Sequence, residues 1–247
     1  MPAHRLLLIG IALLLSACAT TRTAPEDRLP EDPWEPFNRS VYSFNSAADR
    51  AVLRPVARTY ARVTPEPAQR GVVNFFRNLS SPVIMLNLAL QGRGGDLEDE
   101  FQRFVVNTLY GIGGLFDVAT AGNIERHQAD FGQTLARAGW EESRFLMLPF
   151  LGPSTVRDGL GRAVDSPADI AWRRVYSEGA WGLLALRIIE TRAALLPLDD
   201  ELAQAADEYA LIRDAWLQRR NFFIFDGEVD TPDYDAFLDD DWDDWDD

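Results

Sequence analysis

The sequence predicts an all-α protein with a single folded domain, and three observations support this fold class. Apolar residues recur at spacings of three and four, which is the period of one helix face. A cap residue followed by proline, a common helix start, occurs at Thr64-Pro65, Ser81-Pro82 and Ser166-Pro167. No alternating run of five or more residues predicts a strand, and nothing indicates a hairpin.

Helices are expected where the apolar stripes are clearest, at 41–52, 68–79, 97–109 and 202–216. Residues 82–90 and 180–189 are apolar on nearly every side, although Arg187 interrupts the second segment. Both are shorter than the roughly 20 residues that a spanning helix needs. Each is therefore expected either as a buried core helix or as a helix sunk into one membrane leaflet.

Length and composition limit the function classes. The 247 residues suit one large domain or two small ones, and 47% apolar residues suffice for a core. Twelve acidic and no basic residues fall in 226–247, so the net charge of −15 drops to −3 without that stretch. A nearly neutral body offers no basic face for nucleic acid. All 24 basic residues are arginines, which pair bidentately with phosphate.

The first 18 residues predict the compartment. His4 and Arg5 precede a short apolar run that is too brief to span a bilayer, as in a signal peptide. The run Leu15-Ser16-Ala17-Cys18 resembles the bacterial lipobox, which implies cleavage before Cys18 and lipidation of that residue. In the same resemblance, Ala19 implies export to the outer membrane. Two or more acyl chains anchor a protein stably.

Four segments follow from these patterns. Residues 1–17 are the predicted signal peptide, and residues 18–33 are a lipidated N-terminus with a tether rich in threonine and proline. Residues 34–225 are the predicted helical domain. The acidic tail at 226–247 is expected to stay disordered, either as a solvated extension or as a docking or weak cation-binding segment.

Few residue types are left for catalysis. Once Cys18 carries lipid and the signal peptide is removed, His127 is the remaining imidazole and no thiol remains. No catalytic site, metal or cofactor is therefore predicted, because zinc sites need several His or Cys ligands. Phosphate-loop and nucleophile-elbow motifs are absent. A carboxylate pair keeps an envelope hydrolase open, drawn from Asp117, Asp130, Asp158 and Asp165.

Four blocks of sequence stand out together. They are Asp32-Pro33-Trp34-Glu35-Pro36-Phe37-Asn38-Arg39 with Tyr42-Ser43-Phe44-Asn45, Arg103-Phe104 with residues 107–119, residues 130–135 and residues 148–158. In this order the blocks resemble the MlaA (VacJ) lipoprotein family. The resemblance covers roughly residues 32–225, and the acidic C-terminus is not part of the pattern.

The resemblance implies a ring-shaped helical domain embedded in or lying on one leaflet, around an amphipathic central channel. It implies removal of mislocalised phospholipid from the outer leaflet and transfer to a soluble periplasmic carrier, MlaC. Trimeric porins are the implied membrane partners. The alternative is a structural envelope lipoprotein without transport activity.

Within that framework, two sets of residues are candidates for the channel. Asn38, Tyr42, Asn45 and Asp49 form one polar stripe, expected on the channel or its rim, where Arg157 is expected to attract a lipid phosphate or to pair with Asp158. A glycine-rich apolar run is expected either to terminate a helix or to form a flexible hydrophobic gate. It comprises Gly111, Gly113, Gly114, Leu115 and Phe116.

Overall fold

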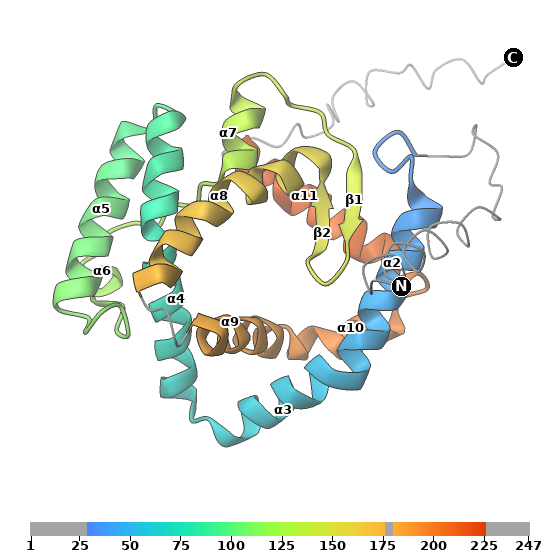
Figure 1. Ribbon diagram of the computed structural model, residues 1–247, viewed down its shortest axis with the longest axis horizontal. Helices are drawn as coiled ribbons and strands as arrows, with labels where there is room; N and C mark the ends of the chain where they lie inside the picture. Colours follow the sequence, from blue (N-terminus) through green and yellow to red (C-terminus); the bar gives the residue numbers. More distant parts are fainter. Residues whose placement is uncertain (1–28, 176–179, 226–247) are drawn as a thin grey trace, which may run out of the picture.

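The computed structural model describes residues 29–175 and 180–225. Their helices are arranged as a ring around a central opening, with one short hairpin on the rim (Figure 1). This confirms the predicted helical, ring-like fold. The predicted signal peptide, Cys18 and the acidic tail at 226–247 lie outside the described residues.

The elements follow one another around the ring (Figure 1). The first half holds α2 (Glu35–Ala48), a π-helical turn (Asp49–Leu53), α3 (Arg54–Val63), α4 (Glu66–Leu90), α5 (Gly94–Leu109), α6 (Val118–Ala121) and α7 (Phe131–Arg137). The second half holds β1 (Phe145–Leu148), β2 (Gly152–Thr155), α8 (Val156–Val175), α9 (Ala180–Ala194), a 3₁₀ turn (Leu196–Leu198), α10 (Asp199–Gln204) and α11 (Glu208–Ile224).

One continuous curved helix forms one side of the ring (Figure 1). Helix α2 passes through the π-helical turn into α3 without leaving helical backbone angles. A π-helical turn adds a residue to the helix and shifts the apolar face. Helix α9 packs against α3 inside this arc and lies between α3 and the opening (Figure 1).

Two of the three predicted helix starts are wrong. Thr64-Pro65 does precede a helix, since α4 begins at Glu66. Pro82 lies inside α4 instead, and Ser166-Pro167 lies inside α8. The Ser81 hydroxyl donates to Glu100 at 2.6 Å rather than capping a helix. Tertiary contacts of this kind outweigh the loss of one backbone hydrogen bond at proline.

The β-hairpin was not predicted, and its stability comes from outside its own sequence. Strands β1 and β2 pair antiparallel, with Phe145 opposite Thr155 and Leu148 opposite Gly152. Each has four residues, too few for a visible alternation. The turn is strained, because Phe150 has a φ of 60°.

Side-chain amides of α2 satisfy the outer edge of β1. Asn38 donates to the Phe145 carbonyl and accepts from the Met147 amide at 2.9 Å. Two helical turns later, Asn45 donates to the Leu148 carbonyl at 3.0 Å and accepts from the Phe150 amide at 2.8 Å. Buried backbone groups need such partners. Helix α2 therefore supplies hydrogen bonds that a third strand would otherwise make to β1.

Ordered packing begins earlier than the predicted domain boundary at Trp34. The Phe145 amide donates to the Glu31 carbonyl at 2.7 Å, which completes the outer edge of β1. The Asp32 carboxylate is fully buried and accepts from Asn38, from the Tyr209 hydroxyl and from Arg213. The folded body therefore includes the end of the segment predicted as a tether.

The buried apolar core is small. Phe145, Met147 and Tyr209 form its centre, with partly buried residues of α2 and α11 around them. Many large apolar side chains are exposed instead, and the most exposed are Trp181 at 81% and Phe150 at 76%. An exposed apolar surface of this extent marks an interaction site or a membrane contact.

The two apolar segments are not buried core helices. In 82–90, Leu88 is fully buried but Leu86 and Leu90 are more than half exposed. In 180–189, Trp181 and Ile188 are exposed. Among the residues that the structure describes, no helix is long and apolar enough to cross a membrane.

Candidate functional site

An apolar cavity of about 1140 Å³ occupies the central opening. Helix α2 and the π-helical turn supply one wall, and the hairpin turn, α8 and α9 supply the others. Its apolar lining consists mainly of Val52, Leu53, Leu148, Phe150, Leu151, Leu184, Ile188 and Leu195.

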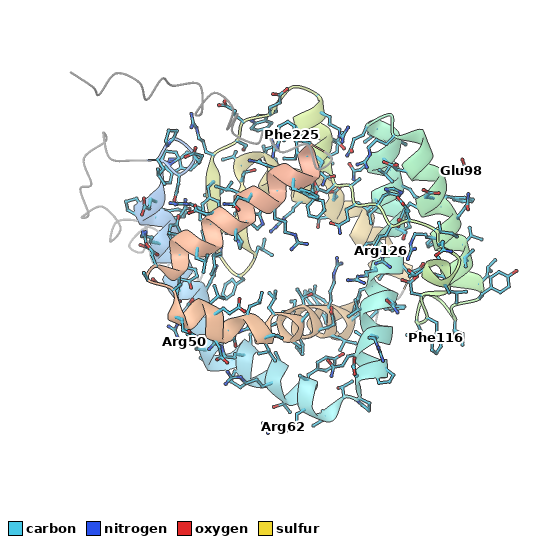
Figure 2. The ribbon with its side chains drawn as sticks, turned by 180° about the vertical axis from the view of Figure 1, so that it is seen from behind. Arg50, Arg62, Glu98, Phe116, Arg126 and Phe225 are labelled. Atoms are coloured by element: carbon cyan, nitrogen blue, oxygen red, sulfur yellow. The ribbon has the colours of Figure 1, made fainter. Side chains whose placement is uncertain are left out.

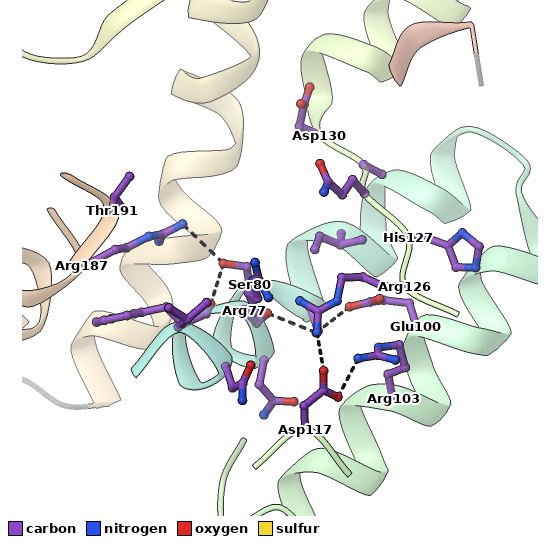
Figure 3. Close-up of a pocket in the computed structure, with 18 of the residues that line it drawn as sticks. Arg77, Ser80, Glu100, Arg103, Asp117, Arg126, His127, Asp130, Arg187 and Thr191 are labelled. Atoms are coloured by element: carbon purple, nitrogen blue, oxygen red, sulfur yellow. Dashed lines mark hydrogen bonds and ion pairs between the residues drawn. The ribbon is translucent and has the colours of Figure 1, made fainter. Parts of the chain in front are cut away.

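A second cavity of about 620 Å³ lies between α4, α5, α9, α11 and the segment that precedes α7. We call it the arginine cavity, because six arginines line it (Figure 3). It shares Arg187 and Thr191 of α9, and Leu195 directly after this helix, with the apolar cavity. The two cavities are therefore neighbours with α9 between them. The surface of the first is mainly apolar, whereas most residues that line the second are polar or charged.

Ion pairs hold one wall of the arginine cavity in place. Asp117 accepts from Arg103 at 2.7 Å and from Arg126 at 3.0 Å. Asp117 also caps α6 by accepting from the Thr120 amide. Burial alone raises the pKa of Asp117, but these donors together hold the pKa below its ordinary value.

Glu100 is a buried carboxyl group of the same cavity, and hydrogen bonds satisfy it only in part. One oxygen accepts from the Ser81 hydroxyl, whereas the other, Oε2, has no hydrogen-bond partner in the described part of the chain. Burial therefore raises the pKa of Glu100 above its ordinary value. The Gln133 side-chain oxygen nearby is also buried without a partner. Unsatisfied polar atoms of this kind are costly.

A third cavity of about 330 Å³ adjoins the arginine cavity and contains a paired network. Arg220 of α11 donates to Asp130 at 2.6 Å and to Asp158 at 2.7 Å. Burial favours the neutral acid, yet Arg220 holds the pKa of Asp130 below its ordinary value. The arginine thus ties α11 to α7 and α8.

Known proteins resemble this chain over nearly its whole length. The profile of the MlaA lipoprotein family matches residues 30–223. The chain belongs to the MlaA lipoprotein family.

Relatives with assigned names agree with the family match. A protein of Escherichia coli named intermembrane phospholipid transport system lipoprotein MlaA is 37% identical over 243 residues, covering 95% of this chain and 94% of the relative. The Haemophilus influenzae protein of that name is 31% identical, covering 88% and 89% of the two chains. A solved structure described as the structural basis for maintenance of bacterial outer membrane lipid asymmetry has a TM-score of 0.68 and 37% identity. It matches 78% of this chain and 98% of that one.

In this MlaA protein, the predicted polar stripe of α2 has mainly structural contacts. Asn38 is fully buried against β1, which excludes it from a channel wall. Tyr42 is half-buried and donates to Glu208 of α11 at 2.8 Å. Asn45 and Asp49 do line the apolar cavity, while they also bind the hairpin and Arg192. Their part in a channel remains a prediction.

Arg157 is likewise buried and cannot receive a lipid phosphate at this position. It is 2% exposed, and its guanidinium donates to the carbonyls of Trp140 and Glu141. It also pairs with Asp158 at 3.3 Å. This pairing was the predicted alternative to binding a lipid phosphate. Arg157 therefore joins α8 to the segment that precedes β1.

The predicted gate of the MlaA fold lies at the outer edge of the ring. Figure 2 shows Phe116 on the side of α4 that faces away from the opening, whereas Arg126 lies beside the opening. The Asn74 amide donates to the Leu115 carbonyl. Gly113 and Gly114 have φ values of 67° and 91°, as in a helix terminator. No residue of this run lines the three cavities.

The carboxylates considered for a hydrolase are engaged elsewhere. Asp130 and Asp158 come together, but Arg220 bridges them. Asp165 accepts from the Asn87 amide and from the Phe131 backbone. His127 pairs with Asp99 at 3.2 Å. Within the described residues, no group of three or more His, Cys, Asp or Glu side chains is placed to hold a metal ion.

The arginines of the cavity were not predicted as functional residues. Arg77, Arg126 and Arg219 lie on three separate segments, and only the fold brings them together. Arg187 was the one visible signal, because it interrupts the apolar run at 180–189. A charged residue in an apolar helix is expected to face a cavity, and it does line both cavities.

Proposed function

We propose that this protein removes mislocalised phospholipids from the outer leaflet of the outer membrane and passes them to a periplasmic carrier. The observation that carries the proposal is the pair of neighbouring cavities inside a ring of MlaA type, one apolar and one rich in arginine. The names of its relatives, which refer to intermembrane phospholipid transport, support the same function.

The two cavities suit the two parts of a phospholipid. Acyl chains need an apolar wall, which Val52, Leu184 and Ile188 supply in the apolar cavity. A headgroup needs polar partners, because charged groups in an apolar medium are costly. Since α9 lines both cavities, a lipid has a route along one helix from one environment to the other.

The exposed apolar surface supports a position in one leaflet. Trp181, Tyr110 and Phe150 are each more than 70% exposed and come from different parts of the ring. Burying such side chains in lipid is favourable by about 1.5–3 kcal/mol each. In this proposal, the acyl chains on Cys18 hold the ring against the outer membrane on its periplasmic side.

The proposal includes two partners and no covalent reaction. A trimeric porin is the expected neighbour in the membrane, and MlaC is the expected periplasmic carrier. Transport moves the intact lipid, so no bond in the substrate is broken. No hydrolase reaction is proposed, because Asp130 and Asp158 are occupied by Arg220.

The deciding measurement is the outer-leaflet phospholipid content of cells that lack this protein. Cells are complemented with the wild-type chain or with Cys18→Ser, which cannot be lipidated. Accumulated outer-leaflet phospholipid that only the wild-type chain removes is the expected result. Unchanged phospholipid in the deletion strain, with expression confirmed in the parent, would contradict the proposal and favour a structural lipoprotein.

A further inference from the structure

The arginine cavity has an excess of positive charge, although the whole chain has a net charge of −15. Its positively charged lining consists of Arg77, Arg103, Arg126, Arg187, Arg219 and Arg220. Its carboxylates are Glu100, Asp117, Asp130 and Glu190. Among the described residues, six guanidinium groups thus face four carboxyl groups, and burial disfavours ionisation of Glu100 and Glu190.

Two of the four carboxylates already form ion pairs with arginines of the cavity. Asp117 alone pairs with both Arg103 and Arg126, and Asp130 pairs with Arg220. Within the described part of the chain, Arg77 has no carboxylate oxygen within 4 Å. Among the described residues, the Arg77 guanidinium is therefore not neutralised by a direct ion pair.

These guanidinium groups come from three segments and face a common space (Figure 3). Arg187 of α9 donates to the Ser80 hydroxyl of α4, three residues beyond Arg77. Glu190 interacts electrostatically with both Arg77 and Arg187. Arg126, from the segment before α7, interacts with Arg77 and Arg103.

Arg126 is destabilised as a cation in this position. Its pKa lies below the ordinary arginine value because burial and the repulsion from Arg103 and Arg77 outweigh the attraction of Asp117 and Glu100. A bound anion removes this repulsion. Phosphate oxygens also match the planar fork of donors that arginine presents.

We propose that Arg77, Arg126 and Arg187 bind the phosphate group of a glycerophospholipid headgroup in the arginine cavity. A lipid is favoured over free phosphate because α9 connects this cavity with the apolar cavity, where acyl chains find Leu184 and Ile188. The inference rests on the proposed function and names the chemical group by which the protein holds its substrate.

The test is a binding measurement on the full lipidated chain in a non-ionic detergent. Dihexanoylphosphatidylglycerol is titrated calorimetrically, with dihexanoylglycerol as the phosphate-free lipid and inorganic phosphate as the lipid-free anion. The variants are Arg77→Gln and Arg126→Gln. The matched control is Arg70→Gln, which lies two turns before Arg77 on α4, is exposed and lines none of the three cavities.

Each cavity variant is expected to weaken binding of the phospholipid about tenfold, as for the loss of one charge-assisted hydrogen bond to phosphate. Arg70→Gln is expected to bind as the wild type does. The affinity for dihexanoylglycerol is expected to be equal in all four proteins, because that lipid has no phosphate.

Arg77→Gln decides the outcome, since Arg77 is exposed and its loss breaks no ion pair in the described chain, whereas Arg126→Gln removes a partner of Asp117. Equal phospholipid affinity in Arg77→Gln and wild type would overturn the headgroup site and leave the proposed function standing. Inorganic phosphate that binds as tightly as the phospholipid would also overturn it, in favour of a free-anion site. If the wild-type chain bound neither lipid, the result would contradict the proposed function itself.

Discussion

The polar stripe of α2 and the arginine cavity lie on opposite sides of the ring, and they differ in how completely their polar groups are paired (Figure 1). On α2, Asn38 and Asn45 each donate and accept hydrogen bonds with the hairpin. In the arginine cavity, Glu100 and Gln133 each have a buried oxygen without a partner among the described residues.

This difference separates polar residues that hold the fold from those that are available to a ligand. A satisfied amide in a buried position has no donor left for a substrate, whatever its place on a helical stripe. Unmatched charge in a cavity has a cost that binding can recover. Pairing therefore locates the site better than residue type or helical spacing does.

Asn38→Ala is expected to have the largest effect of the substitutions considered. It removes three hydrogen bonds and leaves the buried Asp32 carboxylate and the β1 backbone with unsatisfied groups. The free energy of unfolding should fall by about 3 kcal/mol, from about 1 kcal/mol per lost bond. Urea unfolding of the purified chain in detergent measures the change.

Asn74→Ala is the matched control, since Asn74 makes one long hydrogen bond of 3.4 Å to the Leu115 carbonyl. Its loss should cost less than about 1 kcal/mol. If Asn38→Ala were as stable as this control, the hairpin would not depend on α2 and the contrast between the two regions would fail.

Gly114→Ala is expected to have the next largest effect, because it combines backbone strain with a clash. Gly114 has a φ of 91°, and a methyl group there would overlap the Asn78 side chain. Gly113 has a φ of 67° but open space around it. Unfolding free energies should fall by about 2 kcal/mol for Gly114→Ala and by about 1 kcal/mol for Gly113→Ala.

Phospholipid binding by Gly113→Ala tests the gate separately from stability. Since the run at 111–116 lines none of the three cavities, the affinity for dihexanoylphosphatidylglycerol should equal that of the wild type. A loss of affinity in a folded Gly113→Ala protein would restore the gate that the glycine pattern predicts.

Periodicity in the sequence predicted parts of α2, α4, α5 and α11 but not the hairpin, and the stripe at 202–216 is interrupted between α10 and α11. The stripe at 97–109 lies within α5 as expected, although Glu100, Arg103 and Asn107 are the buried residues of this helix and the apolar Phe101 and Leu109 are exposed. The strands depend on contacts that local sequence does not contain, namely the amides of Asn38 and Asn45 and the backbone of Glu31.

The candidate site was less predictable than the fold, for a related reason. Arg77 and Arg126 lie almost fifty residues apart, and nothing near either one marks it as a site residue. The polar stripe of α2 was visible, but spacing does not show whether a side chain is paired. The helical period identified the right face of α2, and that face turned out to hold β1.

A pH titration is expected to affect two sets of carboxyl groups in opposite directions. Burial raises the pKa of Glu100 and Glu190, so their protonated forms stabilise the fold at low pH and this contribution is lost as pH rises through the folded pKa values. Burial also opposes ionisation of Asp49 and Asp130, yet their arginine partners hold both pKa values low. Their contribution is present above about pH 4 and is lost as pH falls through the folded values.

The affinity for phospholipid should depend on the protonation state of Glu190. Protonating Glu190 leaves Arg77 and Arg187 with less negative charge nearby, so phospholipid affinity should rise several-fold as the pH falls through the raised pKa of Glu190. Glu190→Gln should bind more tightly at pH 7 and show a flatter profile. The profile is measured in a His127→Gln background, because His127 also lines the cavity. An unchanged profile in Glu190→Gln would argue against coupling between this carboxyl and the bound phosphate.

Arg70→Gln is expected to have the smallest effect and defines the baseline of the comparison. Arg70 pairs with Glu66 one turn earlier on α4, at 3.6 Å, and the two side chains are 67% and 78% exposed. Solvent screens such a pair, so the unfolding free energy should change by no more than about 0.5 kcal/mol. Arg77 is on the same helix and also exposed, yet its guanidinium faces a cavity of like charges. Suppose that Arg70→Gln weakened lipid binding as much as Arg77→Gln did. General attraction between the protein's positive charges and the lipid would then explain both results, and the arginine cavity would not be a specific binding site.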